Sequence, residues 1–297
     1  MTQITTFAVF ALFQFFSIMP IRFLRFLGTM VGRGAWLMNS RLRQVTEENL
    51  AICYPDMDSK QRETLAKNSL KHLAMTAMEL APIWQRPVTA VLNAVVEVEG
   101  YEDFKQALSD DRGLIILAPH FGSWEVIGLY LAQQARISIM YQPPENQAMQ
   151  QLMYKARSRN GASMVPTDTT GVKALLQALK KGEMIGVLPD QVPPLEGGGF
   201  APFFGVPALT TTLVKKLAKR TGARVMTASV IRLPHSGQFR MVFAAAPEAI
   251  AADDELEALT ALNKSVEDTV ALAPEQYQWE YKRFKKQPDG ERKYYQK

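Results

Sequence analysis

Short apolar runs alternate with longer stretches of mixed apolar and polar residues through most of the chain. The clearest run, Gly113-Leu114-Ile115-Ile116-Leu117-Ala118, contains no polar side chain and predicts a strand buried on both faces. Between such runs, apolar residues recur every three to five positions, which predicts helices. We expect strands over 95–99, 113–118, 138–141, 184–188, 224–231 and 239–245, and helices over 147–159, 171–181, 209–221 and 253–271. This alternation predicts an α/β domain with a mixed, largely parallel central sheet flanked by helices.

Residues 39–87 have a helical pattern of their own, with apolar residues spaced among charged ones. Tyr54-Pro55-Asp56 interrupts the pattern with a turn, and Asp58-Ser59 is a suitable cap for a second helix. We therefore expect two helices ahead of the first strand.

The beginning of the chain differs, because residues 4–21 have no ionisable side chain and include five of the fifteen phenylalanines. A helix of this length would rise roughly 27 Å, close to the roughly 30 Å hydrocarbon core of a bilayer. The positive charges come after this segment, which by the positive-inside rule places the bulk of the chain in the cytoplasm. These charges are Arg22, Arg25, Arg33, Arg41 and Arg43.

We therefore expect a membrane anchor and its basic flank over residues 1–38, and a single domain over 39–297. Pro20 and the short length leave two ways to contact the membrane, a spanning helix or a helix lying in the interface. A buried core helix is the third alternative.

Composition limits the chemistry. The chain has 297 residues, of which 47% are hydrophobic and 21% charged, as is typical of globular proteins. Its single cysteine, Cys53, excludes an intramolecular disulfide framework, and three histidines are too few for a histidine-rich metal site. We expect no metal or redox cofactor. The net charge of +5 favours anionic partners without choosing among them.

The most informative segment, Pro119-His120-Phe121-Gly122-Ser123-Trp124-Glu125, lies between the buried strand and a helical run over 126–134. Ligands of open α/β sheets bind beyond the carboxyl ends of the strands, where His120 is expected. If His120 precedes the first helical turn, its ring can reach back to the Glu125 carboxylate. We predict that His120 is a general base for an attacking hydroxyl and that Glu125 orients its ring.

A nucleophilic serine is the rival interpretation, because Ser123 is close to His120 in sequence. A serine hydrolase elbow requires Gly-x-Ser-x-Gly, however, and Glu125 occupies the last of these positions. Direct transfer without a covalent enzyme intermediate fits better. We expect backbone NH groups near Gly122 and Ser123 to stabilise the oxyanion that would form.

Together with the N-terminal segment and the His-(four residues)-acid spacing, further motifs make the chain resemble the lysophospholipid acyltransferase superfamily. It is most similar to the lipid A biosynthesis acyltransferase branch. These motifs are Asn49-Leu50 through Tyr54-Pro55, Glu79 to Trp84, Tyr141-Gln142-Pro143-Pro144, Arg157-Ser158-Arg159-Asn160-Gly161, Leu188-Pro189-Asp190-Gln191, Pro202 to Pro207, and Pro274 to Trp279 followed by Arg283-Phe284-Lys285. The chain departs from the family pattern at Glu125, Val192 and Tyr281-Lys282, where aspartate is more usual at the first and a His-Arg pair at the last.

This resemblance implies an enzyme of the bacterial inner membrane whose catalytic domain faces the cytoplasm. It implies acyl transfer from acyl carrier protein to a hydroxyl of a lipid A precursor, with anionic membrane lipid as a further partner. Two alternatives remain: another acceptor, such as a lysophospholipid or a glycolipid, or a non-catalytic basic membrane module. No nucleic-acid motif is present, and we expect no nucleic-acid partner.

The resemblance also suggests substrate-binding residues. Lipid A precursors carry phosphates, and arginine forks bind such anions in a bidentate way, so we expect Arg157 and Arg159 to contact substrate or transition state. Asp190 follows an apolar strand and is expected either to orient Arg157 or a substrate hydroxyl, or only to cap the Leu188-Pro189-Asp190 turn; Gln191 is a weaker candidate of the same kind. The glycine-rich segment 197–200 is expected to form a flexible apolar loop over an acyl chain or a plain surface loop.

Overall fold

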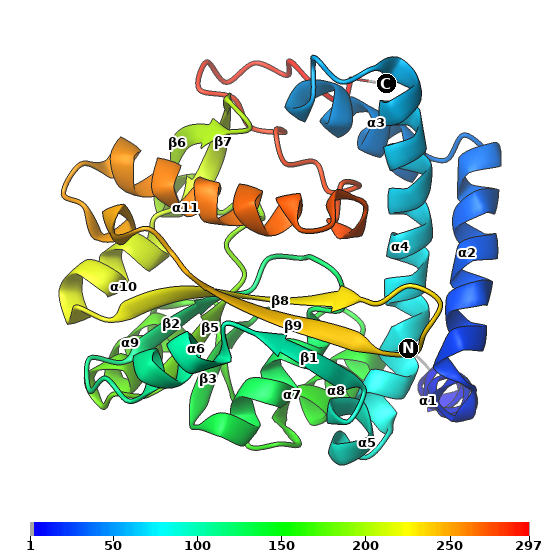
Figure 1. Cartoon of the computed structure of the whole chain (residues 1–297), viewed down its shortest axis with the longest axis horizontal. Coiled ribbons are helices and arrows are strands. Elements are labelled where there is room, and N and C mark those ends of the chain that lie inside the picture. Colours follow the sequence, from blue (N-terminus) through cyan, green and yellow to red (C-terminus); the bar gives the residue numbers. More distant parts are fainter. Residues whose placement is uncertain (1–2, 297) are drawn as a thin grey trace.

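The computed structural model describes residues 3–296, with side chains described from residue 10 onward. A seven-stranded sheet with the order β1-β9-β8-β2-β5-β3-β4 forms its centre (Figure 1). Among the described strands, the pairs in this sheet are parallel except β8–β9, which confirms the expected mixed, largely parallel α/β fold. The strands are β1 (Val95–Glu99), β2 (Leu114–Leu117), β3 (Ile137–Tyr141), β4 (Ser163–Pro166), β5 (Met184–Val187), β8 (Arg224–Arg232) and β9 (Phe239–Ala245).

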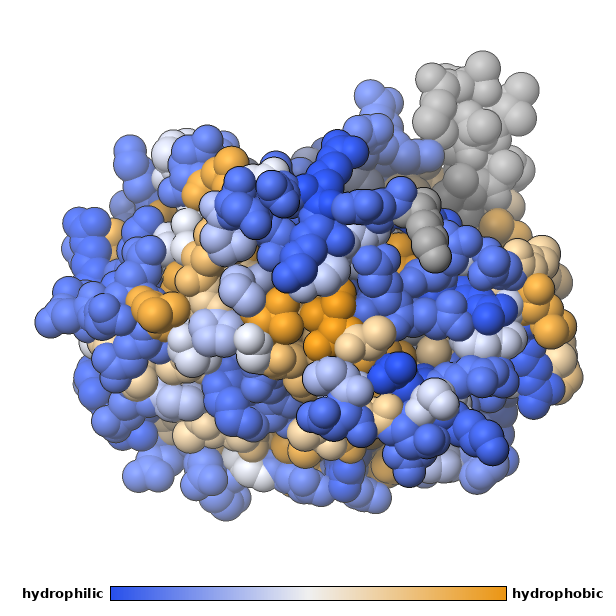
Figure 2. Space-filling model, turned by 90° about the horizontal axis from the view of Figure 1, so that it is seen from above, coloured by the Kyte–Doolittle hydropathy of each residue, from blue (hydrophilic) through white to orange (hydrophobic). Residues whose placement is uncertain are grey.

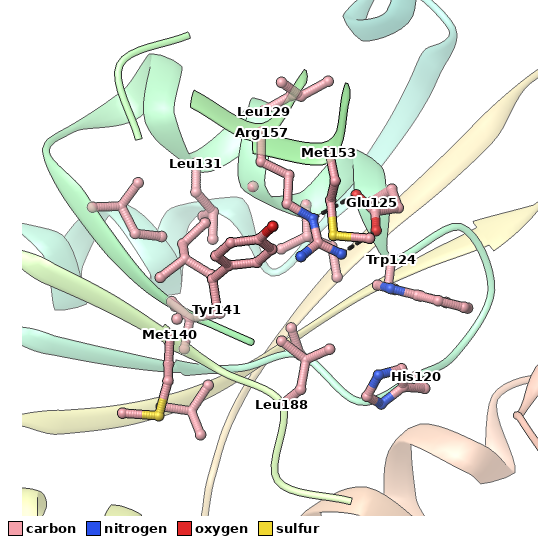
Figure 3. A pocket seen from close by; sticks show the side chains of 18 of the residues that line it. His120, Trp124, Glu125, Leu129, Leu131, Met140, Tyr141, Met153, Arg157 and Leu188 are labelled. Atoms are coloured by element: carbon pink, nitrogen blue, oxygen red, sulfur yellow. Dashed lines mark hydrogen bonds and ion pairs between the residues drawn. The ribbon is translucent and has the colours of Figure 1, made fainter. Parts of the chain in front are cut away.

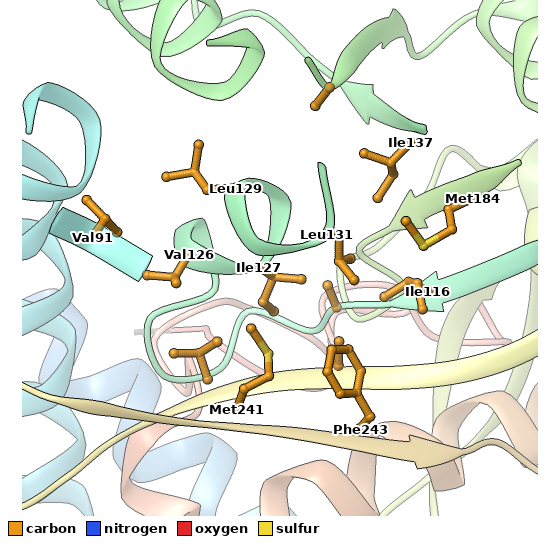
Figure 4. Close-up of a cluster of buried hydrophobic side chains, with 14 of the residues drawn as sticks. Val91, Ile116, Val126, Ile127, Leu129, Leu131, Ile137, Met184, Met241 and Phe243 are labelled. Carbon is orange, nitrogen blue, oxygen red and sulfur yellow. The ribbon is translucent and has the colours of Figure 1, made fainter. Parts of the chain in front are cut away.

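Helices cover both faces of the sheet, and β2 shows why its sequence is an unbroken apolar run. Leu114 and Ile116 point into one core and Ile115 and Leu117 into the other, so both faces of the strand are dry. The first core lies under α4 (Ser59–Gln85), α5 (Val88–Leu92), α6 (Tyr101–Leu108), α7 (Glu125–Gln134) and α8 (Gln147–Ser158), and Figure 4 shows part of it. The second lies under α9 (Thr169–Lys180), α10 (Leu213–Thr221) and α11 (Glu255–Ala271).

A third apolar cluster joins α3 (Arg41–Cys53), the C-terminal segment and the antiparallel hairpin of β6 (Gly198–Phe203) and β7 (Val206–Thr211). Apart from the N-terminal helices, the remaining described elements are the short helices η1 (Leu195–Gly197), η2 (Glu248–Ala251) and η3 (Pro274–Gln276).

The hairpin corrects two sequence-based expectations. The glycine-rich segment is not a flexible loop but strand β6, and the helix expected over 209–221 begins only at Leu213, after β7. A Cβ on Gly199 would lie 2.7 Å from the Leu259 side chain, so this glycine serves close packing against α11 rather than flexibility. Glycine-rich composition alone does not distinguish these two uses.

The expected continuous apolar helix over residues 4–21 is divided. The chain forms α1 (Gln3–Ile18) and then, after Pro20, α2 (Ile21–Leu37). Among the described residues, none of the helices is by itself both long and apolar enough to cross a membrane. Phe10–Ile18 and Ile21–Leu37 pass that length and composition test only as a pair bent by 117°. Residues 1 and 2 of the expected anchor and residue 297 lie outside the described part of the chain.

Helix α2 is docked along α4 rather than separate from the domain (Figure 1). A Cβ on Gly28 or Gly32 would lie 2.7 or 2.5 Å from backbone atoms of α4, so the small residues permit this close approach. Arg25 of α2 stabilises the contact between the two helices by donating a 2.7 Å hydrogen bond to Glu79 of α4. The Glu79 side chain is fully buried.

The opposite side of α2 is apolar and exposed. Phe23, Phe26, Met30 and Val31 are each at least 37% accessible, and apolar side chains gather at the right edge of Figure 2, where α2 lies. Exposed apolar patches of this kind on a soluble surface mark interaction sites.

Candidate active site

His120 and Asp190 meet because two neighbouring parallel strands end side by side. In the β2–β5 register, Leu117 is paired with Val187, and the same register three residues further brings His120 opposite Asp190. The His120 ring places Nδ1 3.0 Å from Asp190 Oδ1, and the His120 backbone NH donates to Oδ2 at 2.9 Å. Asp190 is only 3% exposed, so the carboxylate is held from two directions in a dry environment.

This contact corrects the expected partner of the histidine. The Glu125 carboxylate accepts hydrogen bonds from Trp84 Nε1 at 3.0 Å and from Arg157 Nε at 3.0 Å, with a second contact to Arg157 Nη2. Only four residues separate His120 and Glu125. Helix α7 begins at Glu125, however, and the Glu125 side chain is directed toward Trp84 of α4 and Arg157 of α8. The carboxylate that orients His120 comes instead from 70 residues further along the chain.

Electrostatics keep Asp190 ionised. Burial acts to raise its pKa, but the neighbouring His120 charge and the hydrogen bonds from His120 outweigh burial and leave the pKa of Asp190 below its ordinary value. An ionised acceptor at Nδ1 favours the tautomer with the proton on Nδ1, which leaves a lone pair on Nε2. The Gln191 amide nitrogen lies 3.2 Å from Nε2 and fits as its donor in this tautomer.

A pocket with a volume of about 370 Å³ extends from His120 and Gln191 into the first core. Its size lies within the range of about 300–1,000 Å³ that is usual for small-ligand sites. In the view of Figure 3, His120 and Trp124 lie on one side of the pocket, and Leu131 and Met140 lie on the other. The interior wall is aliphatic and is formed by Ile116, Ile127, Leu129, Leu131, Ile137 and Ile139.

The polar part of the pocket wall is an ion pair. Arg157 and Glu125 both line the cavity, and the guanidinium also lies over the Tyr141 ring, 5.7 Å from its centroid (Figure 3). Burial acts to lower the pKa of Arg157, but the Glu125 carboxylate outweighs it and holds the pKa above its ordinary value. The pocket therefore combines an aliphatic interior, a fixed cation and the histidine in one lining.

Arg159, expected beside Arg157 as a substrate contact, lies elsewhere. Its Nη1 donates to the carbonyls of Trp84 at 2.8 Å and Arg86 at 2.7 Å, and its Nη2 donates to Ile83. These carbonyls form the C-terminal end of α4, where a cation is favoured by the helix dipole. In this structure Arg159 thus caps a helix and joins α4 to α8.

The expected backbone oxyanion site at Gly122 and Ser123 is also corrected. Gly122 NH donates to the Gln276 carbonyl at 2.8 Å, and Ser123 NH donates to the Val230 carbonyl at 2.9 Å. The Ser123 hydroxyl donates to Glu79 at 3.0 Å and is buried. These groups hold the turn after β2 in place, and the serine hydroxyl is not directed toward His120.

Two signals in the sequence could have located the histidine–aspartate contact. Leu117-Ala118-Pro119-His120 and Val187-Leu188-Pro189-Asp190 are both strand ends followed by proline and an ionisable residue. The sequence does not show, however, that β2 and β5 are neighbours in the sheet. Trp84, which lines the pocket and binds Glu125, has no sequence signal beyond its place at the end of a motif.

Near the site, Glu280 is a further carboxyl group whose oxygens are buried. Both of its oxygens are buried without a well-formed hydrogen bond to any described residue, although the Gln278 side chain is close. Burial raises the pKa of Glu280 to about 7, and the His120 charge opposes this rise only in part. A carboxyl group whose pKa rises on folding binds its proton more tightly in the native state, so its contribution favours folding at low pH and is lost as the pH rises.

Replacing Glu280 with glutamine is therefore expected to stabilise the protein at pH 8 by about 3 kcal/mol, because the amide never ionises. The gain should disappear near pH 4.5, the ordinary pKa of the group. Denaturant unfolding of the detergent-solubilised chain at both pH values measures this difference, with the exposed Glu291→Gln as a matched control. Equal unfolding free energies for E280Q and the wild type at pH 8 would show that Glu280 is not desolvated.

Comparison with known proteins points to one family. The family model for bacterial lipid A biosynthesis acyltransferases matches residues 1–286. Lipid A biosynthesis palmitoleoyltransferase of Escherichia coli (strain K12) is 30% identical over 270 residues, which cover 91% of this chain and 87% of the relative. Lipid A biosynthesis lauroyltransferase of the same organism is 29% identical and covers 89% and 86%, and the myristoyltransferase is 24% identical and covers 88% and 80%.

Proposed function

Since the chain belongs to the bacterial lipid A biosynthesis acyltransferase family, we propose that it transfers a fatty acyl chain from acyl carrier protein to a hydroxyl of a lipid A precursor. The observation that carries this proposal is the His120–Asp190 pair at one end of an aliphatic pocket. The pocket suits a hydrocarbon chain, and the pair suits removal of a proton from a hydroxyl.

In the proposed reaction, the Nε2 lone pair of His120 accepts the proton of the acceptor hydroxyl as its oxygen attacks the thioester carbonyl carbon. The ionised Asp190 stabilises the imidazolium that forms. Collapse of the tetrahedral intermediate breaks the carbon–sulfur bond, and the imidazolium returns the proton to the leaving thiolate. The products are an ester and a free thiol, with no acyl-enzyme intermediate. Gln191, which donates to Nε2 in the free enzyme, gives way to the acceptor hydroxyl.

Arg157 is our candidate for stabilising the oxyanion. Its Nε and Nη2 are used by Glu125, which leaves Nη1 outside that ion pair, and the residue lines the pocket that also contains His120. A pre-positioned cation of this kind stabilises developing negative charge because it needs no reorganisation during the reaction. Glu125 therefore stays in the proposed site in a changed role: it fixes the arginine rather than the histidine.

We further propose that residues 1–38 attach the catalytic domain, residues 39–297, to the cytoplasmic face of the inner membrane. The exposed apolar side of α2 supports this, as do the exposed Arg22 and Arg33 on the same helix. Because α2 is docked along α4, attachment by an apolar face lying in the interface fits this structure better than a spanning helix does. Arginines beside that face would contact anionic lipid headgroups.

Lipid extracts from a bacterial strain lacking this chain test the proposed acceptor. We expect lipid A that is lighter by one secondary acyl chain, restored when the gene is returned on a plasmid, as read by mass spectrometry. Unchanged lipid A together with an accumulated lysophospholipid or glycolipid would contradict the proposal and identify a different acceptor class. A non-catalytic membrane module would leave all of these lipids unchanged.

A further inference from the structure

Helix α1 has two distinct faces. Phe10 and Phe13 pack against the first core, and Ser17, one turn further, is buried. Leu12, Phe15 and Ile18 on the other side are 53%, 55% and 73% exposed. The spacings of three and four between the inward positions place them along one stripe of the helix. A helix that served only as an anchor would have no need of a stripe fitted to the domain.

The inward stripe reaches the wall of the pocket. The Phe13 ring stacks on the Trp84 indole, with centroids 5.6 Å apart and planes at 10°. Trp84 lines the pocket, and its Nε1 donates the 3.0 Å hydrogen bond to Glu125 Oε2. Glu125 in turn holds Arg157, so a continuous series of contacts runs from α1 to the cation of the pocket.

Two arginines hold the ends of α1 and α4 in this arrangement. Arg86, just after α4, donates from Nε to the Ser17 carbonyl at 2.7 Å and from Nη2 to the Met19 carbonyl, which holds the C-terminal end of α1. Arg159, just after α8, binds the carbonyls of Ile83, Trp84 and Arg86, which holds the end of α4 in the same place. The junction of α1, α4 and α8 is thus cross-linked by hydrogen bonds around Trp84.

We propose that α1 is part of the active site and that Phe13 is a positioning residue: by stacking on Trp84, it fixes the indole that orients Glu125 and Arg157. This inference rests on the proposed acyl transfer but assigns α1 a role beyond membrane attachment. The chain therefore needs α1 for turnover even where no bilayer is present. Loss of the stack lets the indole move, and small displacements of a positioned charge cost much of its catalytic effect.

Kinetics in detergent micelles separate this role from membrane attachment. We expect Phe13→Ala to lower kcat roughly fivefold to tenfold, with KM for the acceptor unchanged, because an aromatic stack is lost. Phe15→Ala is the matched control: its ring is exposed and contacts Phe16 of the same helix, so its kcat should stay at the wild-type value. Phe13→Tyr keeps the ring and should recover most of the lost activity.

A double-mutant cycle tests whether Phe13 acts through Trp84. Trp84→Phe keeps an aromatic ring at the site but removes the donor to Glu125, and is expected to lower kcat at least as much as Phe13→Ala. Adding Phe13→Ala to Trp84→Phe should then cause little further loss. Fully additive losses, or equal kcat values for Phe13→Ala and Phe15→Ala, would overturn the inference. No transfer by the wild type would instead be a failure of the proposed function itself.

Discussion

Replacing His120 with alanine is expected to lower kcat for acyl transfer by roughly 10²- to 10⁴-fold, the usual contribution of a positioned general base. His120 Nε2 lies in the pocket wall, and its Nδ1 is bound by Asp190, so no other described histidine can replace it. His72 is half-buried on α4, where loss of solvation lowers its pKa to about 3, and His235 lies in an exposed turn. Initial rates with purified enzyme and an acyl carrier protein donor measure the loss.

The control for this prediction is His235→Asn, because asparagine tolerates the positive φ of 54° at that position. Its rate should equal that of the wild type. Unfolding midpoints of both variants should stay close to that of the wild type, which separates loss of chemistry from loss of fold. A rate for His120→Ala near that of the wild type would remove the histidine from the mechanism.

Replacing Asp190 with asparagine is expected to cause the second-largest loss, roughly 10²- to 10⁴-fold in kcat, because the amide neither fixes the Nδ1–H tautomer nor stabilises an imidazolium. The pKa of Asp190 is below its ordinary value despite burial. The carboxyl group is therefore ionised at any pH above the ordinary pKa of an aspartate and becomes protonated only in stronger acid. The Asp190 carboxylate therefore stays ionised between about pH 6 and pH 9, and its own titration adds nothing to the pH dependence of the loss in that range.

Asp289→Asn changes an exposed carboxylate in the same way and is expected to leave kcat unaltered. The Asp190→Asn prediction also discriminates between the two acids that follow His120. If Asp190→Asn retained the wild-type rate and Glu125→Gln lost it, Glu125 would be the carboxylate that supports His120 during catalysis. The observed His120–Asp190 contact would then not be the catalytic pair.

Strong local patterns make most of the fold predictable. The run over 113–118 is typical of a strand covered on both faces, and Leu114 to Leu117 alternate between two cores. Asp58 caps α4 as expected, with its carboxylate accepting from the NH groups of Lys60 and Gln61. The hairpin of β6 and β7 is not predictable in this way, because its glycines match both a loop and a closely packed strand.

For the candidate site, the sequence indicates most of the residues that the structure brings together but not which of them contact one another. His120, Glu125, Arg157, Asp190 and Gln191 all line the pocket or contact a residue that does. Which acid faces which base depends on strand order, and β5 lies beside β2 although β3 and β4 come between them along the chain. Likewise, nothing in the local sequence distinguishes Arg157 from Arg159, although one pairs with Glu125 and the other caps a helix.

The N-terminal segment shows a further limit of sequence patterns. Its uniform hydrophobicity is consistent with a spanning helix, an interfacial helix and a buried helix. The structure divides it at Pro20 and gives its two sides different surroundings, since Phe13 is packed against Trp84 and Phe15 is exposed. Hydrophobicity shows that both sides of the helix are apolar, but it does not indicate which side packs against the domain and which side is exposed.

Mass spectrometry of the product formed from a lipid A precursor and an acyl carrier protein donor tests the central claim most directly. We expect purified wild-type enzyme to add the mass of one acyl chain to the precursor as an ester, and His120→Ala and Asp190→Asn to leave the precursor unmodified over the same time. An acylated product formed equally well by His120→Ala, or an unmodified precursor with the wild type, would contradict the account.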